Sequence, residues 1–148
     1  MTPTIRRAGA EDLPGMLALY RHLHPTDPVL APAAAEAAWR ALLSSGMTVP
    51  VVAELIGVLV SSCTLAIIPN MSRGARPYGV IENVVTDPAH RRTGMGRAVL
   101  QAALDIAWEA GCYKVMLATG SRQEATLRFY EGAGLTRGGK THFEVRRP

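Results

Sequence analysis

The sequence contains few cysteines and histidines, and this shortage excludes several classes of site. Its two cysteines, Cys63 and Cys112, lie far apart, which gives neither a disulfide framework nor the spacing of a thiolate metal site. The four histidines are scattered. His22 and His24 share one stretch but have no carboxylate or thiol partner at ligand spacing. We therefore expect no metal ion.

Long hydrophobic runs are also missing. Residues 1–7 lack the apolar centre of a signal peptide, and no later run approaches the roughly 20 apolar residues that a membrane helix requires. We therefore expect no membrane partner and a cytoplasmic location. Hydrophobic residues at 48% and charged residues at 19% are typical of a folded chain rather than a disordered one. With 148 residues and no repeat or linker, the sequence predicts a single domain over residues 1–148.

The net charge of +4 raises the alternative of a basic nucleic-acid-binding domain. The arginines, however, concentrate in two short segments, residues 73–76 and 91–97, and no aromatic residues are interleaved with them. Nucleic-acid surfaces usually combine the two residue types. We therefore expect no nucleic-acid partner and favour a small anionic ligand.

The hydrophobic pattern predicts an α/β fold in which strands and helices alternate. An antiparallel hairpin is expected at Ile56-Gly57, and a strand, helix, strand unit over residues 78–119 should hold two parallel strands. Helices are expected at residues 11–23, 32–43, 97–110 and 124–131. Strands are expected at residues 4–7, 47–55, 57–68, 78–86 and 114–119, followed by a closing hairpin of residues 135–138 and 141–146.

The loop between the strand at 78–86 and the following helix has an unusual charge. The first turn of a helix favours acidic side chains by about 0.3–1 kcal/mol, because unpaired N–H groups give it a partial positive charge. This helix begins among Arg91, Arg92 and Arg97 instead. Such a cluster is reasonable where an anion binds, and glycine at 94 and 96 would let that anion approach the backbone amides. The loop therefore predicts a phosphate or pyrophosphate ligand.

Two motifs resemble the GNAT superfamily of N-acetyltransferases. Arg91, Gly94 and Gly96 match the Arg/Gln-x-x-Gly-x-Gly/Ala loop that binds the pyrophosphate of coenzyme A, and residues 129–135, Phe-Tyr-Glu-Gly-Ala-Gly-Leu, resemble a second family segment. The resemblance implies a central mixed sheet flanked by about four helices, with a splayed pair of parallel strands that holds the cofactor. It also implies an enzyme that uses acetyl-CoA.

The resemblance implies the residues that bind the cofactor. The pyrophosphate loop corresponds to Arg91, Arg92, Thr93, Gly94, Met95, Gly96 and Arg97. The pantetheine arm would pair with the backbone of Asn83, Val84 and Val85, and an N–H of that strand would hold the developing oxyanion. Many family members carry a cofactor-binding asparagine seven residues before the tyrosine of the second motif, where this chain has Gln123.

The resemblance also implies an acid and a base. A primary amine with a pKa near ~10 is almost fully protonated at neutral pH, so a nearby carboxylate that accepts its proton accelerates attack. Glu82 interrupts an apolar strand nine residues before Arg91, as the base does in several family branches. The alternative is a solvated glutamate or one paired with Arg76. Tyr130 is the expected acid for the leaving thiolate, and the alternative is a core aromatic.

The sequence gives less information about the molecule that accepts the acetyl group. Residues 80–85 and 129–131 look like the glucosamine-phosphate N-acetyltransferase branch, in which Arg73 and Arg76 would bind the sugar phosphate. A solvated basic loop is the alternative for these two arginines. The expected activity is transfer of an acetyl group to a primary amine of a small molecule by direct attack. A non-catalytic acetyl-CoA-binding sensor or partner-binding module is the alternative, and a homodimer stays open.

Overall fold

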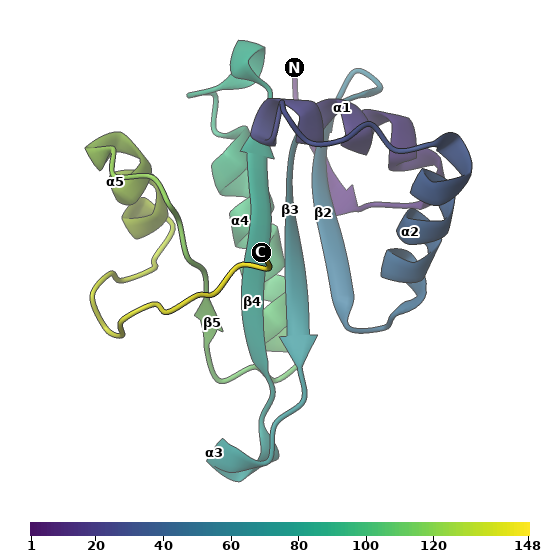
Figure 1. Ribbon diagram of the computed structural model, residues 1–148. Coiled ribbons are helices and arrows are strands. Elements are labelled where there is room, and N and C mark those ends of the chain that lie inside the picture. The colour runs from purple at the N-terminus through teal and green to yellow at the C-terminus, as the bar shows by residue number, and fades with distance from the viewer.

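A five-stranded mixed sheet organises the chain (Figure 1), and the computed structural model describes all residues from 1 to 148. The strands lie in the order β1-β2-β3-β4-β5; the first four are antiparallel to their neighbours, and β4 and β5 are parallel. Their bounds are β1 Thr4–Arg7, β2 Thr48–Leu55, β3 Val58–Ile68, β4 Tyr78–Thr86 and β5 Val115–Met116. The predicted α/β class with a mixed sheet is confirmed.

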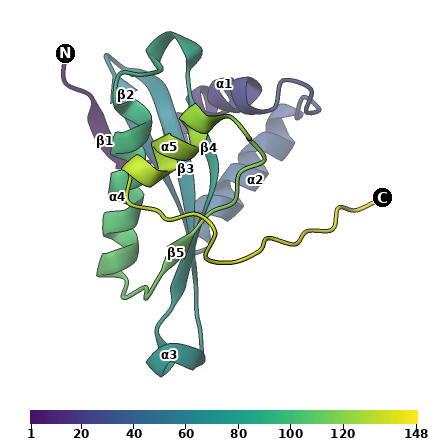
Figure 2. The ribbon, with the colours of Figure 1, turned by 90° about the vertical axis from the view of Figure 1, so that its left-hand side faces the viewer.

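Helices cover both faces of this sheet, with α4 on one face and α1 and α2 on the other (Figure 2). The four helices expected from the sequence are present within one or two residues of their predicted ends. Three short helices lie between the longer elements. The bounds are η1 Ala10–Asp12, α1 Leu13–Leu23, α2 Pro32–Ser44, α3 Ser72–Ala75, η2 Pro88–His90, α4 Met95–Glu109 and α5 Glu124–Gly132.

The core has two layers because the sheet is buried on both faces. Neighbouring residues of β2 point to opposite layers, so Val51 packs toward α4 while Val52 packs with Met16 and Trp39. A strand buried on both sides needs apolar side chains at every position, which explains the continuous run at residues 49–53. The larger layer includes Leu65, Ile81, Val99 and Leu100, all at most 1% exposed.

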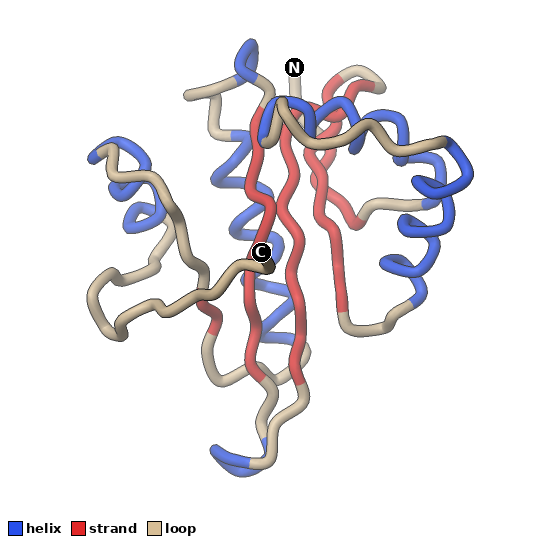
Figure 3. Tube along the Cα trace, in the orientation of Figure 1, coloured by secondary structure: helices blue, strands red, loops and turns tan.

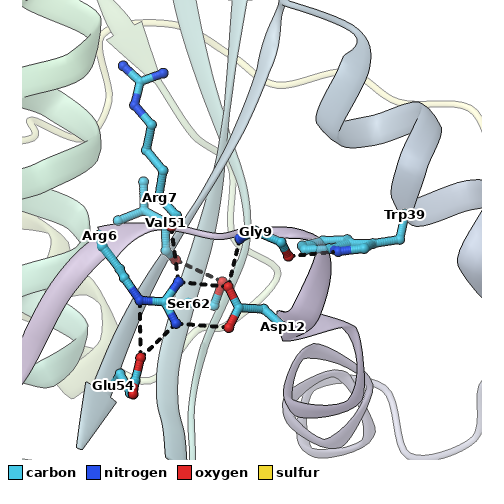
Figure 4. A network of polar contacts seen from close by, with 8 residues as sticks. All are labelled: Arg6, Arg7, Gly9, Asp12, Trp39, Val51, Glu54 and Ser62. Atoms are coloured by element: carbon cyan, nitrogen blue, oxygen red, sulfur yellow. Dashed lines mark hydrogen bonds and ion pairs between the residues drawn. The ribbon is translucent and has the colours of Figure 1, made fainter. Parts of the chain in front are cut away.

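An ion-pair network connects β1 to β2 and to the start of α1 (Figure 4). The guanidinium of Arg6 donates to Asp12 at 2.7 and 2.9 Å and to Glu54 at 2.6 Å, and the backbone N–H of Gly9 donates to Asp12 at 2.7 Å. The indole of Trp39 donates to the carbonyl of Gly9 at 3.0 Å. The Arg6 hydrogen bonds outweigh burial and hold the pKa of Asp12 below its ordinary value. The network therefore fixes where α1 starts on the sheet.

Two sequence predictions about the C-terminal part were wrong. The strand expected at 114–119 is limited to β5, two residues long, and no strand forms at 135–138 or 141–146. Residues 136–148 make no backbone to backbone hydrogen bond and run as an extended loop in front of β4 (Figure 3). A strand needs a neighbouring edge, and beyond Met116 the chain runs away from β4 toward α5 (Figure 1).

Candidate functional site

The parallel strands β4 and β5 separate in the middle of the sheet. They pair only at Gly79 with Val115 and at Val80 with Met116, whereas β4 continues to Thr86. The register between β3 and β4 also shifts at this level, where Asn83 has a φ of 53°. This irregularity is a β-bulge, which bends the strand and disrupts its pairing. The splay implied by the family resemblance is thus present, and β4 has no strand partner on its β5 side beyond Val80.

A cavity of about 380 Å³ lies where the two strands separate. It brings together the predicted base Glu82, the predicted acid Tyr130 and the cofactor-binding candidates Asn83 and Val84. The loop of residues 117–120 after β5 forms another side. The remaining lining residues are Leu23, His24, Ile81, His142, Glu144 and Arg146.

Glu82 is exposed and has no counter-ion. It forms no ion pair with Arg76, the partner that the alternative interpretation required, and it lines the cavity instead. In register it lies directly opposite Thr64 of β3, so the two side chains share one face of the sheet. The hydroxyl of Thr64 is buried and has no hydrogen-bond partner. A free carboxylate at a cavity wall can accept a proton, directly or through water.

Tyr130, on α5, is half buried and lines the same cavity. Burial raises the pKa of its hydroxyl above the ordinary value, and the nearby Cys63 and Glu82 raise it further. The phenol therefore stays protonated at neutral pH and can donate a proton. Its neighbour Phe129 packs against it edge to face, with ring centroids 5.2 Å apart, and both rings are partly buried against the larger core layer.

The loop before α4 presents unpaired positive charge. Gly94 is the N-cap, in the left-handed region at a φ of 86°, and no side chain caps the first turn. The arginines pair with no carboxylate: Arg91 donates to the carbonyl of Thr86 at 3.4 Å and Arg97 to that of Gly132 at 2.6 Å. Free N–H groups and guanidinium groups at one helix start form a suitable site for an anion.

The second glycine of the loop has a packing role in addition to the one predicted from the sequence. Gly96 is buried, and a Cβ atom there would lie 3.0 Å from Oγ1 of Thr86 and 3.1 Å from the ring of Phe129. Glycine at 96 therefore lets α4 pack closely against β4 and α5. Around Gly94, by contrast, a Cβ would meet no atom within 4 Å.

Three other predicted residues lie away from the cavity. Arg73 and Arg76 are on the loop that carries α3, at the end of the sheet opposite η2 (Figure 3), where their guanidinium groups lie 5.8 and 5.7 Å from the ring of Tyr113. Neither lines the cavity of Glu82 and Tyr130. Gln123 is the exposed N-cap of α5 and does not line it either.

Some lining residues had no signal in the sequence. His142, Glu144 and Arg146 reach the cavity from a segment that was predicted as a hairpin. Leu23 and His24 reach it from the C-terminal end of α1. The apolar alternation of residues 141–146 could have marked every second side chain as facing one surface, but not which surface.

No group of three or more His, Cys, Asp or Glu side chains is placed to bind a metal ion. The helices are all too short or too polar to cross a membrane.

Comparison with known proteins agrees with this geometry. The model of the acetyltransferase (GNAT) family matches residues 16–135. The fold resembles a solved structure of a putative acetyltransferase from Agrobacterium tumefaciens, with 45% identity, a TM-score of 0.93, and coverage of 97% of this chain and 99% of that one. Glucosamine-6-phosphate N-acetyltransferase from Arabidopsis thaliana shares the fold, with a TM-score of 0.86, 23% identity, and coverage of 98% and 99% of the two chains.

A relative identified by sequence similarity is also named as an N-acetyltransferase. Over 78 residues the chain is 42% identical to glucosamine 6-phosphate N-acetyltransferase of Trypanosoma brucei brucei. The match covers 53% of this chain and 51% of that protein, so it spans about half the length of the relative. The family model, the splayed strands and the pyrophosphate-type loop lead to one conclusion. The chain belongs to the GNAT family of acetyltransferases.

Proposed function

We propose that this chain is an acetyl-CoA-dependent N-acetyltransferase that acts on a primary amine of a small molecule. The observation that carries the proposal is that Glu82 and Tyr130 line one cavity, at the point where β4 and β5 separate. The cavity adjoins a strand edge without a partner, and the same strand leads to the cationic loop before α4. An acid, a base and an anion site thus surround one gap in the sheet.

In the proposed reaction, the residues of the cavity and of the loop before α4 have separate roles. The amine nitrogen attacks the thioester carbonyl, and Glu82 accepts the proton that the ammonium group must lose. A backbone N–H of residues 83–85 on β4 stabilises the oxyanion. When the carbon–sulfur bond breaks, the thiolate takes the proton of Tyr130, and the second proton lost by the amine nitrogen restores the phenol. Arg91, Arg92, Arg97 and the backbone N–H groups from Thr93 to Gly96 hold the pyrophosphate, and Gln123 contributes an amide to the cofactor.

An amino sugar phosphate is the proposed acceptor, in a homodimer. Relatives named glucosamine 6-phosphate N-acetyltransferase support this class. Arg73 and Arg76 have no acidic partner. Their guanidinium groups lie beside Tyr113, outside the cavity of their own subunit. We assign them to the phosphate of a substrate bound in a second subunit. Because acetyl-CoA is an intracellular metabolite, we also propose a cytoplasmic location.

Thiol release from acetyl-CoA, measured over a panel of amines that includes glucosamine 6-phosphate and glucosamine, tests the activity. We expect turnover with at least one amine and a preference for the phosphorylated sugar. Replacing Glu82 with Gln or Tyr130 with Phe should lower kcat by about 10²- to 10⁴-fold, the usual contribution of a positioned acid or base.

Calorimetry with coenzyme A on the same variants provides the control, because neither side chain is assigned to cofactor binding. The affinity should stay within about threefold of the wild type, whereas Arg91→Ala should lower it. Binding without turnover on any amine would instead support a non-catalytic sensor or partner-binding module. Absence of coenzyme A binding would overturn the assignment.

A further inference from the structure

One buried hydroxyl of β3 has no hydrogen-bond partner within the chain. Thr64 is 9% exposed, and its Oγ1 is one of only two buried side-chain polar atoms that lack a partner. An unpaired buried polar group costs free energy, so native proteins keep few of them. The other buried hydroxyls of β3, on Ser61 and Ser62, each donate to a backbone carbonyl, at 3.0 and 2.9 Å. Thr64 is thus an exception within its own strand.

Glu82 is the polar side chain that lies across from Thr64. The two residues are direct partners in the antiparallel register of β3 and β4, beside the β-bulge. Cβ atoms of such partners are about 4.5–5.5 Å apart on the same face of the sheet. The glutamate side chain is long enough to span this distance, so a rotation of its torsions brings a carboxylate oxygen to the hydroxyl. Thr64 does not line the cavity. It lies behind Glu82.

No group at the cavity wall holds the carboxylate of Glu82. The titratable groups that line the cavity with it are His24, Tyr130, His142, Glu144 and Arg146. His142 and Arg146 both contact Glu144, at 3.6 and 3.5 Å. The side chain of Glu82 forms neither an ion pair nor a hydrogen bond with any of the five. The hydroxyl behind it is therefore the donor that remains to orient it.

The phenol of Tyr20, on α1, is a second polar neighbour of Thr64. Helix α1 crosses β3 and β4 on this face of the sheet (Figure 1). Burial raises the pKa of Tyr20 and the hydroxyl of Thr64 acts in the opposite direction, so the two hydroxyl groups are close. Because its pKa is raised, Tyr20 stays neutral and does not compete with a carboxylate as an acceptor. The proton of the Thr64 hydroxyl is thus available to Glu82.

We propose that Thr64 is a positioning residue for the base: its hydroxyl donates to one carboxylate oxygen of Glu82 and leaves the other oxygen to accept the proton of the substrate ammonium. The inference rests on the proposed function, in which Glu82 is that base, and adds the group that orients it. A carboxylate on a flexible side chain otherwise occupies several rotamers, of which only some face the amine. Holding it in one of them raises the fraction of encounters that lead to proton transfer.

Steady-state kinetics of thiol release, with an amine that the wild type acetylates, test the proposal. Thr64→Val keeps the shape of the side chain but removes the hydroxyl. It should lower kcat by about tenfold, a part of the roughly 10²- to 10⁴-fold that a positioned base contributes. Calorimetry should show coenzyme A affinity unchanged in this variant. Thr64→Ser retains the hydroxyl, so kcat should stay within about threefold of the wild type.

A double-mutant cycle shows whether Thr64 acts through the carboxylate. In the Glu82→Gln background there is no base to position, so adding Thr64→Val should lower kcat by less than about twofold further. A residue that only supports the fold would lower kcat by the same factor in both backgrounds. The cycle therefore separates a positioning role from a general structural one.

Thermal unfolding gives a readout that does not depend on activity. Thr64→Val replaces an unpaired buried hydroxyl with a methyl group, so Tm should stay the same or rise. Thr48→Val is the matched control in the same sheet, because its hydroxyl donates to the carbonyl of Leu42 at 2.7 Å. This control should lower Tm, while kcat of the folded enzyme stays within about twofold, since Thr48 lies outside the cavity.

The outcomes distinguish this inference from the proposed function. A normal kcat in Thr64→Val, in an enzyme that Glu82→Gln impairs, would overturn the inference alone. A loss of kcat that persists in full in the Glu82→Gln background, or that comes with a fall in Tm as large as that of Thr48→Val, would overturn it as well. A wild type without turnover on any amine would overturn both the inference and the proposed function.

Discussion

Single residues of the loop before α4 have separable roles. Gly94 adopts a backbone conformation that other residues reach only with strain, and open space surrounds its Cα. Gly96 has no such requirement, but Thr86 and Phe129 occupy the space that a side chain would need. Glycine is thus required at 94 by the backbone conformation and at 96 by internal packing.

Gly96→Ala should therefore destabilise the fold. The added methyl must displace Thr86 or the Phe129 ring, and overpacking of this kind costs about 1–3 kcal/mol. Because Phe129 contacts Tyr130, kcat should also fall. Urea unfolding gives the stability change. Gly139→Ala, at an open position without positive φ, should change the free energy of unfolding by less than about 0.5 kcal/mol. Equal stability of both variants would contradict this account of Gly96.

The residues of the cavity were predictable to different degrees. Glu82 and Tyr130 stand in motifs, and both lie at the cavity. The sequence did not predict that Arg73 and Arg76 lie away from the cavity. Their distance in sequence from Glu82 does not show which end of the sheet carries the site. Thr64, which lies opposite Glu82 in register but does not line the cavity, gave no signal at all, since a threonine is ordinary in a strand.

Among the secondary-structure elements, the β2–β3 hairpin has a strained turn, and a substitution can relieve the backbone strain. Ile56 and Gly57 form its two-residue turn with φ values of 50° and 74°. Turns of this type favour Asn-Gly, and a β-branched residue at positive φ is strained. Ile56→Asn should raise the free energy of unfolding by about 1 kcal/mol.

Thermal or urea unfolding measures this change, and coenzyme A affinity should not move because the turn lies outside the site. Gly57→Ala should have the opposite sign, because it places a Cβ at positive φ. A destabilised Ile56→Asn variant would show that the turn residue packs on something that compensates for its strain.

Most elements were predictable because their patterns are local. The periodicity of α1 and α4 and the apolar runs of β2 to β4 determine each element without reference to its neighbours. The pairing of strands, by contrast, depends on residues that are distant in the sequence. Residues 141–146 alternate as a strand does, yet the edge that such a strand needs is absent from this chain, and β5 is short because the chain turns toward α5.

For the whole molecule, the network of Arg6, Asp12 and Glu54 makes stability depend on pH. The pKa of Asp12 is lowered in the folded state, so its carboxylate stabilises the fold at neutral pH, and this contribution is lost as the pH falls through the lowered pKa. Asp12→Asn should cost about 2–3 kcal/mol at pH 7, because it weakens charged hydrogen bonds to a side chain that is 7% exposed.

Urea unfolding of both proteins at pH 7 and in steps below pH 4 checks the sign. The stability difference between wild type and Asp12→Asn should shrink in acid, as protonation removes the same charge from the wild type. Glu11→Gln serves as the control, since Glu11 is exposed and outside the network. A difference that stays constant with pH would mean that the carboxylate charge is not what stabilises α1.

The gap between β4 and β5 makes the sheet incomplete in the free protein, so an extended ligand can act as its missing strand. Alternate amides of residues 81–86 face that gap without a strand to accept their protons. They should exchange with deuterium far faster than those of β3, and slow sharply once the pantetheine chain is bound. The same backbone that positions the thioester would then report, amide by amide, how tightly it is held.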